Sequence, residues 1–190
     1  MKVIAIDVGG TKLAVAIVDC NGSILAARKS PVEKACAEAT AEQIASEADA
    51  VRREAGLSWS GIAAAGVVVP GILDSSNRTA WAPNLWGDRE VAFGAYLARR
   101  LQLPLHIEGD RAGYVLGERW LGVARGLDDV VFVAIGTGIG AGIIADGRLI
   151  RGAAGASGAV GWMAMNSGRW EDEGAGPAVA RAGERGHPGE

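Results

Sequence analysis

The sequence predicts an α/β protein, in which strands and helices pack in layers. Three observations predict this class. An apolar run at the N-terminus stops at an acid and two glycines and then resumes, as two strands joined by a turn do. An alanine- and glutamate-rich stretch follows, with apolar residues at helical spacing. Residues 62–69 are then a continuous apolar run, which is typical of a strand covered on both faces.

Composition limits the class of protein. The 190 residues, 49% of them hydrophobic, are enough for one core or two small lobes. A net charge of −3 gives no electrostatic reason to expect nucleic acid or a membrane as a partner. Cys20 and Cys36 lack a CxxC spacing, so we expect reduced thiols in a cytoplasmic protein. Asp7 interrupts the first apolar run too early for a signal peptide.

The first element is a hairpin of strands at 4–8 and 15–19, and Asn21-Gly22 marks the turn that follows it. Backbone N–H groups of the glycine turn at 9–12 could hold a phosphate as an anion-binding nest. Asp7, at the strand end, could hold the water of a metal ion. An ordinary hairpin turn explains this stretch alone equally well.

The next elements are a strand at 24–27 and a helix that we expect from Pro31 to Ala55. The strand at 62–69 ends at Pro70-Gly71. A loop at 81–87 then places two tryptophans around Asn84, which suits sugar recognition, although tryptophans that anchor the loop to the core explain it equally well. The remaining elements of this half are a helix at 91–101, a strand at 103–107 and a helix that ends at Trp120.

The second half repeats the hairpin pattern. A strand at 130–135 precedes the glycine-rich run 136–142, and strands at 143–145 and 148–150 flank an Asp-Gly turn. The run formally fits a dinucleotide fingerprint, but a strand follows it instead of a helix, which excludes the Rossmann interpretation. We expect a short helix at 177–182 and a frayed terminus at 182–190.

With both turns placed, the sequence resembles the ROK family of sugar kinases, within the actin-like ATPase superfamily, over residues 1–161. The motifs that carry the resemblance are Asp7-Val-Gly-Gly-Thr-Lys12, Val69-Pro-Gly-Ile-Leu-Asp74, Asn84-Leu-x-Gly87, Glu108-Gly-Asp110, Leu116-Gly-Glu-x-Trp-x-Gly122 and Gly136-Thr-Gly-Ile-Gly-Ala-Gly142. The resemblance implies an actin-like ATPase (ribonuclease H-like) fold. Its first lobe would occupy 1–107, and 108–190 would begin an incomplete second lobe.

The resemblance also implies roles for single residues, with ATP and Mg²⁺ as cofactors and a small-molecule sugar as substrate. Asp110 resembles the general base that takes the proton of the sugar hydroxyl, and Asp7 resembles the residue that faces the magnesium. The implied phosphate-binding residues are Gly9, Gly10, Thr11, Lys12, Gly136, Thr137, Gly138 and Gly140. The implied sugar-binding residues are Asn84, Gly109, Asp110 and Glu171.

The sequence departs from the family pattern at several of these places. Gly109 replaces the usual asparagine before the catalytic aspartate. Ala159 and Trp162 stand where the family has a sugar-binding glutamate and a zinc-binding histidine, and the cysteine cluster is missing, so we expect no structural zinc. Glu171 would then correspond to a sugar-contacting glutamate in a shortened loop.

These observations predict an ATP-dependent kinase of a hexose-like sugar, with Asp110 as general base. The alternative is a non-catalytic or truncated relative that binds nucleotide, sugar or a partner chain. An actin-like chaperone or activase is disfavoured because the Asn84 and Asp110 stretches are present. A ROK repressor is disfavoured because no helix-turn-helix precedes Met1. We expect a homo-oligomer, from the resemblance and from the uncovered second hairpin.

Overall fold

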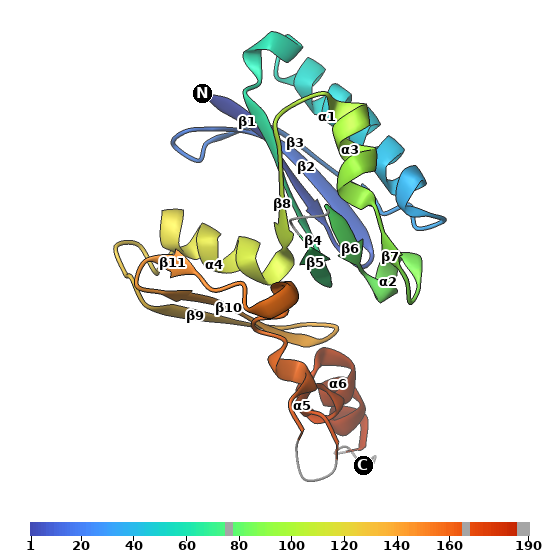
Figure 1. Cartoon of the computed structure of the whole chain (residues 1–190), viewed down its shortest axis with the longest axis vertical. Coiled ribbons are helices and arrows are strands. Elements are labelled where there is room, and N and C mark those ends of the chain that lie inside the picture. Colours follow the sequence, from blue (N-terminus) through green and yellow to red (C-terminus); the bar gives the residue numbers. More distant parts are fainter. Residues whose placement is uncertain (75–77, 165–167, 186–190) are drawn as a thin grey trace. The chain divides into compact units, whose positions relative to one another are not determined.

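The structure is a computed structural model of the 190-residue chain, and it describes residues 1–74, 78–164 and 168–185. The chain divides into two compact units, Met1–Asp110 and Arg111–Glu190, and Figure 1 shows the elements of both. This division lies three residues beyond the boundary expected between 107 and 108. The architecture is α/β, as the sequence predicts.

A five-stranded mixed sheet organises the first unit, in the order β3-β2-β1-β4-β8. Antiparallel pairing joins β1 to β2 and β2 to β3, whereas β1, β4 and β8 run parallel. The carboxyl ends of the three parallel strands therefore lie side by side along one side of the sheet, which we call its carboxyl edge. The strands are β1 (Lys2–Val8), β2 (Lys12–Asp19), β3 (Ile24–Pro31), β4 (Ala64–Val69) and β8 (Leu105–Gly109).

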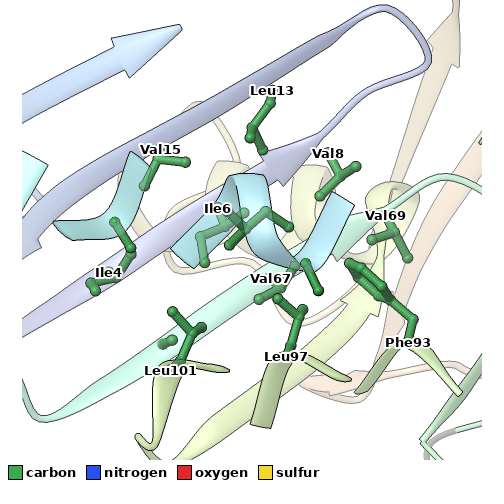
Figure 2. Close-up of a cluster of buried hydrophobic side chains, with 14 of the residues drawn as sticks. Ile4, Ile6, Val8, Leu13, Val15, Val67, Val69, Phe93, Leu97 and Leu101 are labelled. Atoms are coloured by element: carbon green, nitrogen blue, oxygen red, sulfur yellow. The ribbon is translucent and has the colours of Figure 1, made fainter. Parts of the chain in front are cut away.

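The hydrophobic core lies on one face of this sheet, under α1 (Ala37–Glu54) and α3 (Phe93–Leu101) (Figure 1). Alternate residues of β1 are buried there, because successive side chains of a strand point to opposite faces. Figure 2 shows the apolar side chains of β1, β2 and β4 meeting those of α3. The labelled members are Ile4, Ile6, Val8, Leu13, Val15, Val67, Val69, Phe93, Leu97 and Leu101.

Two expectations about these elements were wrong. Residue Pro31 ends β3 instead of opening the helix, because it pairs with Lys12 at the edge of the sheet, where a missing N–H is tolerated. The helix begins at Ala37, and Cys36 Sγ accepts the Ala39 N–H at 3.4 Å as its N-cap. Burial along β4 alternates, so this strand is packed into the core on one face and not on both.

The segment after β4 forms a small antiparallel sheet and a short helix. The sheet contains β5 (Ile72–Asp74), β6 (Thr79–Trp81) and β7 (Glu90–Val91), and the helix is α2 (Pro83–Trp86). Trp86 is buried, its Nε1 donates to Thr40 Oγ1 at 2.9 Å, and its ring lies 4.6 Å from that of Phe93. Of the two interpretations of the tryptophan loop, the structure therefore supports an anchoring role for Trp86.

The second unit begins with most of α4 (Asp110–Leu121), which packs on a three-stranded sheet in the order β11-β10-β9. A Cβ on Gly142 would lie 2.2 Å from the Arg111 carbonyl oxygen, so the close approach of α4 requires glycine there. On the opposite face, β9 exposes Val131, Val133 and Ile135. The strands are β9 (Val130–Ile135), β10 (Ile139–Ala145) and β11 (Arg148–Leu149).

Short helices complete the described part of the chain. They are η1 (Trp59–Gly61), η2 (Ala153–Gly155), η3 (Val160–Trp162), α5 (Trp170–Gly174) and α6 (Gly176–Arg185). The last of these is longer than the helix expected at 177–182 and takes up the first residues of the predicted frayed terminus, while 186–190 lie outside the described residues. In the described residues, no helix combines the length and the apolar composition needed to cross a membrane.

Replacing the buried hydroxyl of Thr40 tests the Trp86 anchor. We expect Thr40→Val to lower the free energy of unfolding by about 1–3 kcal/mol, because the buried indole N–H of Trp86 loses its acceptor. Urea denaturation measures the change. Thr79→Val is the control, since its hydroxyl bonds Glu90 at an exposed site where water can replace it. Equal losses in the two variants would contradict the anchoring role.

Candidate functional site

The carboxyl edge of the parallel strands carries the first group of predicted site residues. Asp7 is the second-last residue of β1, Gly109 is the last residue of β8, and Asp110 follows directly as the first residue of α4. Because Ile6 and Val8 are buried in the core, the Asp7 side chain points to the opposite face of the sheet. The structure thus brings Asp7 and Asp110 to one edge of one sheet.

One row of residues crosses all five strands at the level of Asp7. The pairs Lys29↔Ala14, Ala14↔Asp7, Asp7↔Val68 and Val68↔Glu108 join β3, β2, β1, β4 and β8. Paired residues of adjacent strands share a face, so this row sets a cation and two carboxylates on the face opposite the core. Asp110 lies two residues beyond the end of the row.

The electrostatics of Asp7 follow from this row. Partial burial raises the pKa of the Asp7 carboxyl, the nearby Asp110 charge raises it further, and Lys29 acts in the opposite direction. Two carboxylates that repel one another favour a bound cation. Mg²⁺ is commonly held by only one or two carboxylates together with substrate phosphates, and this pair fits that pattern. Within the described residues no group of three or more His, Cys, Asp or Glu side chains is arranged to hold a metal.

Glu108 is a member of the row to which sequence reasoning gave no role. Its side chain is only 12% exposed, and its Oε1 lies 3.2 Å from His106 Nε2. Glu108 could have been found from the sequence only by aligning β1, β4 and β8 in parallel, which sets Glu108 in the same row as Asp7. That alignment depends on strand pairing, which composition does not reveal.

The first glycine turn, Gly9-Gly10-Thr11, joins β1 to β2. The Gly9 N–H donates to the Lys12 carbonyl at 2.8 Å, which closes the turn. A Cβ added to Gly10 would meet nothing within 4 Å. Thr11 and Lys12 are exposed. The turn therefore presents Gly10 to open space beside the end of β1, where Asp7 lies.

The second glycine turn is shorter than expected. Only Gly136-Thr137-Gly138 forms the turn between β9 and β10, and the Gly136 N–H donates to the Gly138 carbonyl at 2.9 Å. A Cβ on Gly136 would also meet nothing within 4 Å. Gly140 lies within β10 instead, where a Cβ would come within 2.5 Å of Arg111 Cδ, so packing against α4 explains this glycine.

The remaining predicted residues lie elsewhere in the two units. Asn84 is exposed on α2, which belongs to the first unit. Glu171 belongs to α5 in the second unit. Trp162, which we expect at the position of a zinc-binding histidine, ends the short helix η3 and is 46% exposed. The structure thus joins Asp7, Gly109 and Asp110 at one edge and describes the other predicted residues on separate elements.

Comparison with known proteins decides the family. The family model described as "ROK family" matches residues 3–189. This chain belongs to the ROK family. A glucokinase from Streptomyces coelicolor is 32% identical over 190 residues, which cover 94% of this chain and 57% of that enzyme. A xylose repressor from Caldicellulosiruptor bescii is 38% identical over 108 residues, which cover 56% of this chain and 27% of the repressor.

Solved structures agree with this family and fold. The ROK hexokinase from Thermus thermophilus has a TM-score of 0.82 and 31% identity, covering 98% of this chain and 64% of the other. The ROK glucokinase from Streptomyces griseus, in complex with glucose and AMPPNP, has a TM-score of 0.85 and 28% identity, covering 97% of this chain and 61% of the other. The fold is the actin-like ATPase fold of the ROK sugar kinases. The ROK protein thus spans less than two thirds of each of these relatives.

The raised pKa of Asp7 predicts how stability depends on pH. At a pH above the raised pKa of Asp7, this carboxyl is charged in both the folded and the unfolded state. The charge is less favourable in the folded state, so Asp7 lowers the free energy of unfolding at neutral pH. We expect Asp7→Asn to be more stable than wild type at pH 7 by less than about 1 kcal/mol, since solvent screens the repulsion. The gain should vanish as the pH falls toward 3.8, the ordinary value. Urea denaturation at several pH values measures it.

Asp19 provides a control of opposite sign. Backbone N–H groups of Ser23 and Asn21 donate to the Asp19 carboxyl and lower its pKa. The charged Asp19 therefore stabilises the fold at pH values above its ordinary pKa. Asp19→Asn should therefore lose stability at pH 7. A loss of stability at pH 7 in Asp7→Asn as well would contradict the raised pKa of Asp7.

Proposed function

We propose that this chain is the part of an ATP-dependent sugar kinase that carries the catalytic base, and that its reaction is phosphorylation of a hexose-like hydroxyl. The observation that carries the proposal is the Asp7–Asp110 carboxylate pair at the carboxyl edge of the parallel strands. Membership of a family with glucokinases supports it, as does the glucose and AMPPNP complex of the Streptomyces griseus relative.

In this proposal Asp110 accepts the proton of the sugar hydroxyl as general base. A carboxylate that follows a strand end directly is held by the sheet, and a positioned base of this kind typically contributes about 10²–10⁴-fold to the rate. Asp7 would hold Mg²⁺ through its water ligands. Bound Mg²⁺ would supply charge neutralisation for the phosphates of ATP. Because Asp110 raises the pKa of Asp7, the pair has an electrostatic reason to take up a cation.

The two glycine turns would each bind phosphate. Open space in front of Gly10 and of Gly136 allows a ligand oxygen to approach the backbone, which a side chain would prevent. Lys12 adds a positive charge at the end of the first turn. We place Thr11, Thr137 and Gly138 in the same role, because they complete the two turns. Asn84 and Glu171 stay proposed sugar contacts.

A second candidate function is binding of a sugar without catalysis. Two departures that the resemblance implies favour it, since Ala159 and Trp162 stand where we expect a sugar-binding glutamate and a zinc-binding histidine. The similarity to a xylose repressor over 108 residues also supports this candidate, because repressors and kinases share the family. In this case Asp110 would orient a sugar hydroxyl by hydrogen bonding and transfer no proton.

Replacing the proposed base distinguishes the two candidates. We expect Asp110→Asn to lower sugar-stimulated ADP release at least about 100-fold, because the amide cannot take the proton. A coupled ADP assay over a panel of hexoses measures the rate. Asp49→Asn is the control, since that carboxylate pairs with Arg52 and Arg53 on α1. If no sugar stimulates wild type beyond the Asp110 variant while calorimetry detects sugar binding, the binding candidate replaces the kinase.

Filling the glycine turns tests the phosphate sites separately. We expect Gly10→Val and Gly136→Val each to weaken ATP binding about 10- to 100-fold, the equivalent of one lost charge-assisted hydrogen bond. Thermal melting should change little, because a Cβ at either position meets nothing within 4 Å. Gly66→Val in β4 is the matched control, with the same open surroundings. Unchanged ATP affinity in a folded variant would remove that turn from the site.

A further inference from the structure

Residues 31–33 end β3, begin the connection to α1 and lie beside the first glycine turn. The N–H of Val32, the first residue after β3, donates to the Thr11 carbonyl at 3.2 Å. This bond continues the pairing of β3 with β2, in which Lys12 lies opposite Pro31. The last residue of the glycine turn is therefore held by residues 31–33, and its position depends on what holds them.

Two side chains of α1 hold residues 31–33 from the other side. Gln43 Nε2 donates to the Pro31 carbonyl at 2.7 Å, and Gln43 Oε1 accepts the Glu33 N–H at 2.8 Å. Thr40, which is fully buried, donates from Oγ1 to the Glu33 carbonyl at 2.7 Å. Thr40 and Gln43 are three residues apart, so they share one face of the helix. These bonds fasten the segment to α1.

The Gln43 amide takes the place of a neighbouring strand. Strand β3 lies at the end of the five-stranded sheet. Because Val32 turns its N–H toward β2, the Pro31 carbonyl and the Glu33 N–H point away from the sheet, on the side where an edge strand has no ladder partner. A glutamine amide carries one acceptor oxygen and two donor hydrogens. Gln43 therefore supplies both partners, whereas an apolar side chain of similar length supplies neither.

The hold on Thr11 limits the conformations of the first glycine turn. One bond, from the Gly9 N–H to the Lys12 carbonyl, closes the turn, and the bond from Val32 to the Thr11 carbonyl fixes its last residue. The N–H groups of Gly10 and Thr11 lie between these two bonds along the chain. A binding loop that is ordered before its ligand arrives loses less conformational freedom on binding. A fixed Thr11 therefore favours binding of an anion by this turn.

We propose that Thr40 and Gln43 are positioning residues for the first glycine turn. Neither side chain contacts phosphate in this proposal. Both hold residues 31–33, and Val32 in turn holds Thr11. The inference rests on the proposed function, because it takes the first glycine turn as a binding site for the phosphates of ATP.

Replacing Gln43 tests this role. We expect Gln43→Met to weaken ATP binding about 5- to 10-fold, because the turn then becomes ordered only when ATP binds. Calorimetry with ATP and Mg²⁺ measures the affinity without turnover. Arg52→Met is the matched control, since Arg52 Nη1 holds the Leu57 carbonyl at 2.5 Å from the last turn of the same helix. This control should bind ATP as tightly as wild type.

Thr40 provides a rescue test. Thr40→Val removes the hydroxyl and should weaken ATP binding about as much as Gln43→Met does. Thr40→Ser keeps the hydroxyl and should bind ATP within about 2-fold of wild type. Serine lacks the threonine methyl, so a general loss of packing would weaken ATP binding in both Thr40 variants. Circular dichroism at the temperature of the titration establishes that each variant is folded.

The outcomes separate this inference from the kinase proposal. If wild type phosphorylates a sugar but Gln43→Met binds ATP as tightly as wild type, the kinase proposal stands and the inference fails. If no sugar is phosphorylated but Gln43→Met and Thr40→Val weaken ATP binding while Thr40→Ser does not, the inference stands and the kinase proposal fails. Equal weakening in Arg52→Met, or no ATP binding by wild type, overturns the inference.

Discussion

Parallel pairing of β1, β4 and β8 is the constraint on which the arrangement of the site depends. Because these strands share a direction, the residues that follow their carboxyl ends gather at one edge, although Asp7 and Asp110 are far apart in sequence. The same pairing aligns Asp7 with Glu108 in one row, and antiparallel pairing through β2 and β3 adds Lys29 to that row. Burial of the alternate residues on the other face, under α1 and α3, then fixes which way this row points.

The core and the charged row are thus two faces of one sheet with opposite energetic roles. Apolar burial under α1 and α3 stabilises the first unit. The Asp7 carboxyl on the other face acts against stability, because desolvation and the Asp110 charge raise its pKa. A fold can tolerate such local repulsion only when packing elsewhere exceeds it, and perturbed acids of this kind are common at functional sites. The repulsion between the Asp7 and Asp110 carboxylates lies next to the first glycine turn, so the charge at this edge differs from that of the apolar core.

Much of this arrangement could be predicted from sequence, and the exceptions have physical reasons. Apolar runs on either side of a glycine-rich turn predicted the hairpins, because that pattern depends on neighbouring residues alone. The start of α1 was missed because pairing of Pro31 with Lys12 is a contact between strands. The buried state of Trp86 depends on Thr40, 46 residues away in sequence. Gly140 looked like part of a turn, but its neighbour Arg111 comes from α4.

The exposed face of β9 has a consequence for how the chain behaves in solution. Its six residues, Val-Val-Phe-Val-Ala-Ile, contain no charge and no proline, and the strand lies at the edge of the sheet described for the second unit. Short apolar segments of high β-propensity on an open edge are the usual starting points of aggregation. Colloidal stability of this chain therefore depends on how β9 is covered, and a charged side chain at Val131 or Val133 is the place where solubility can be engineered without altering either glycine turn.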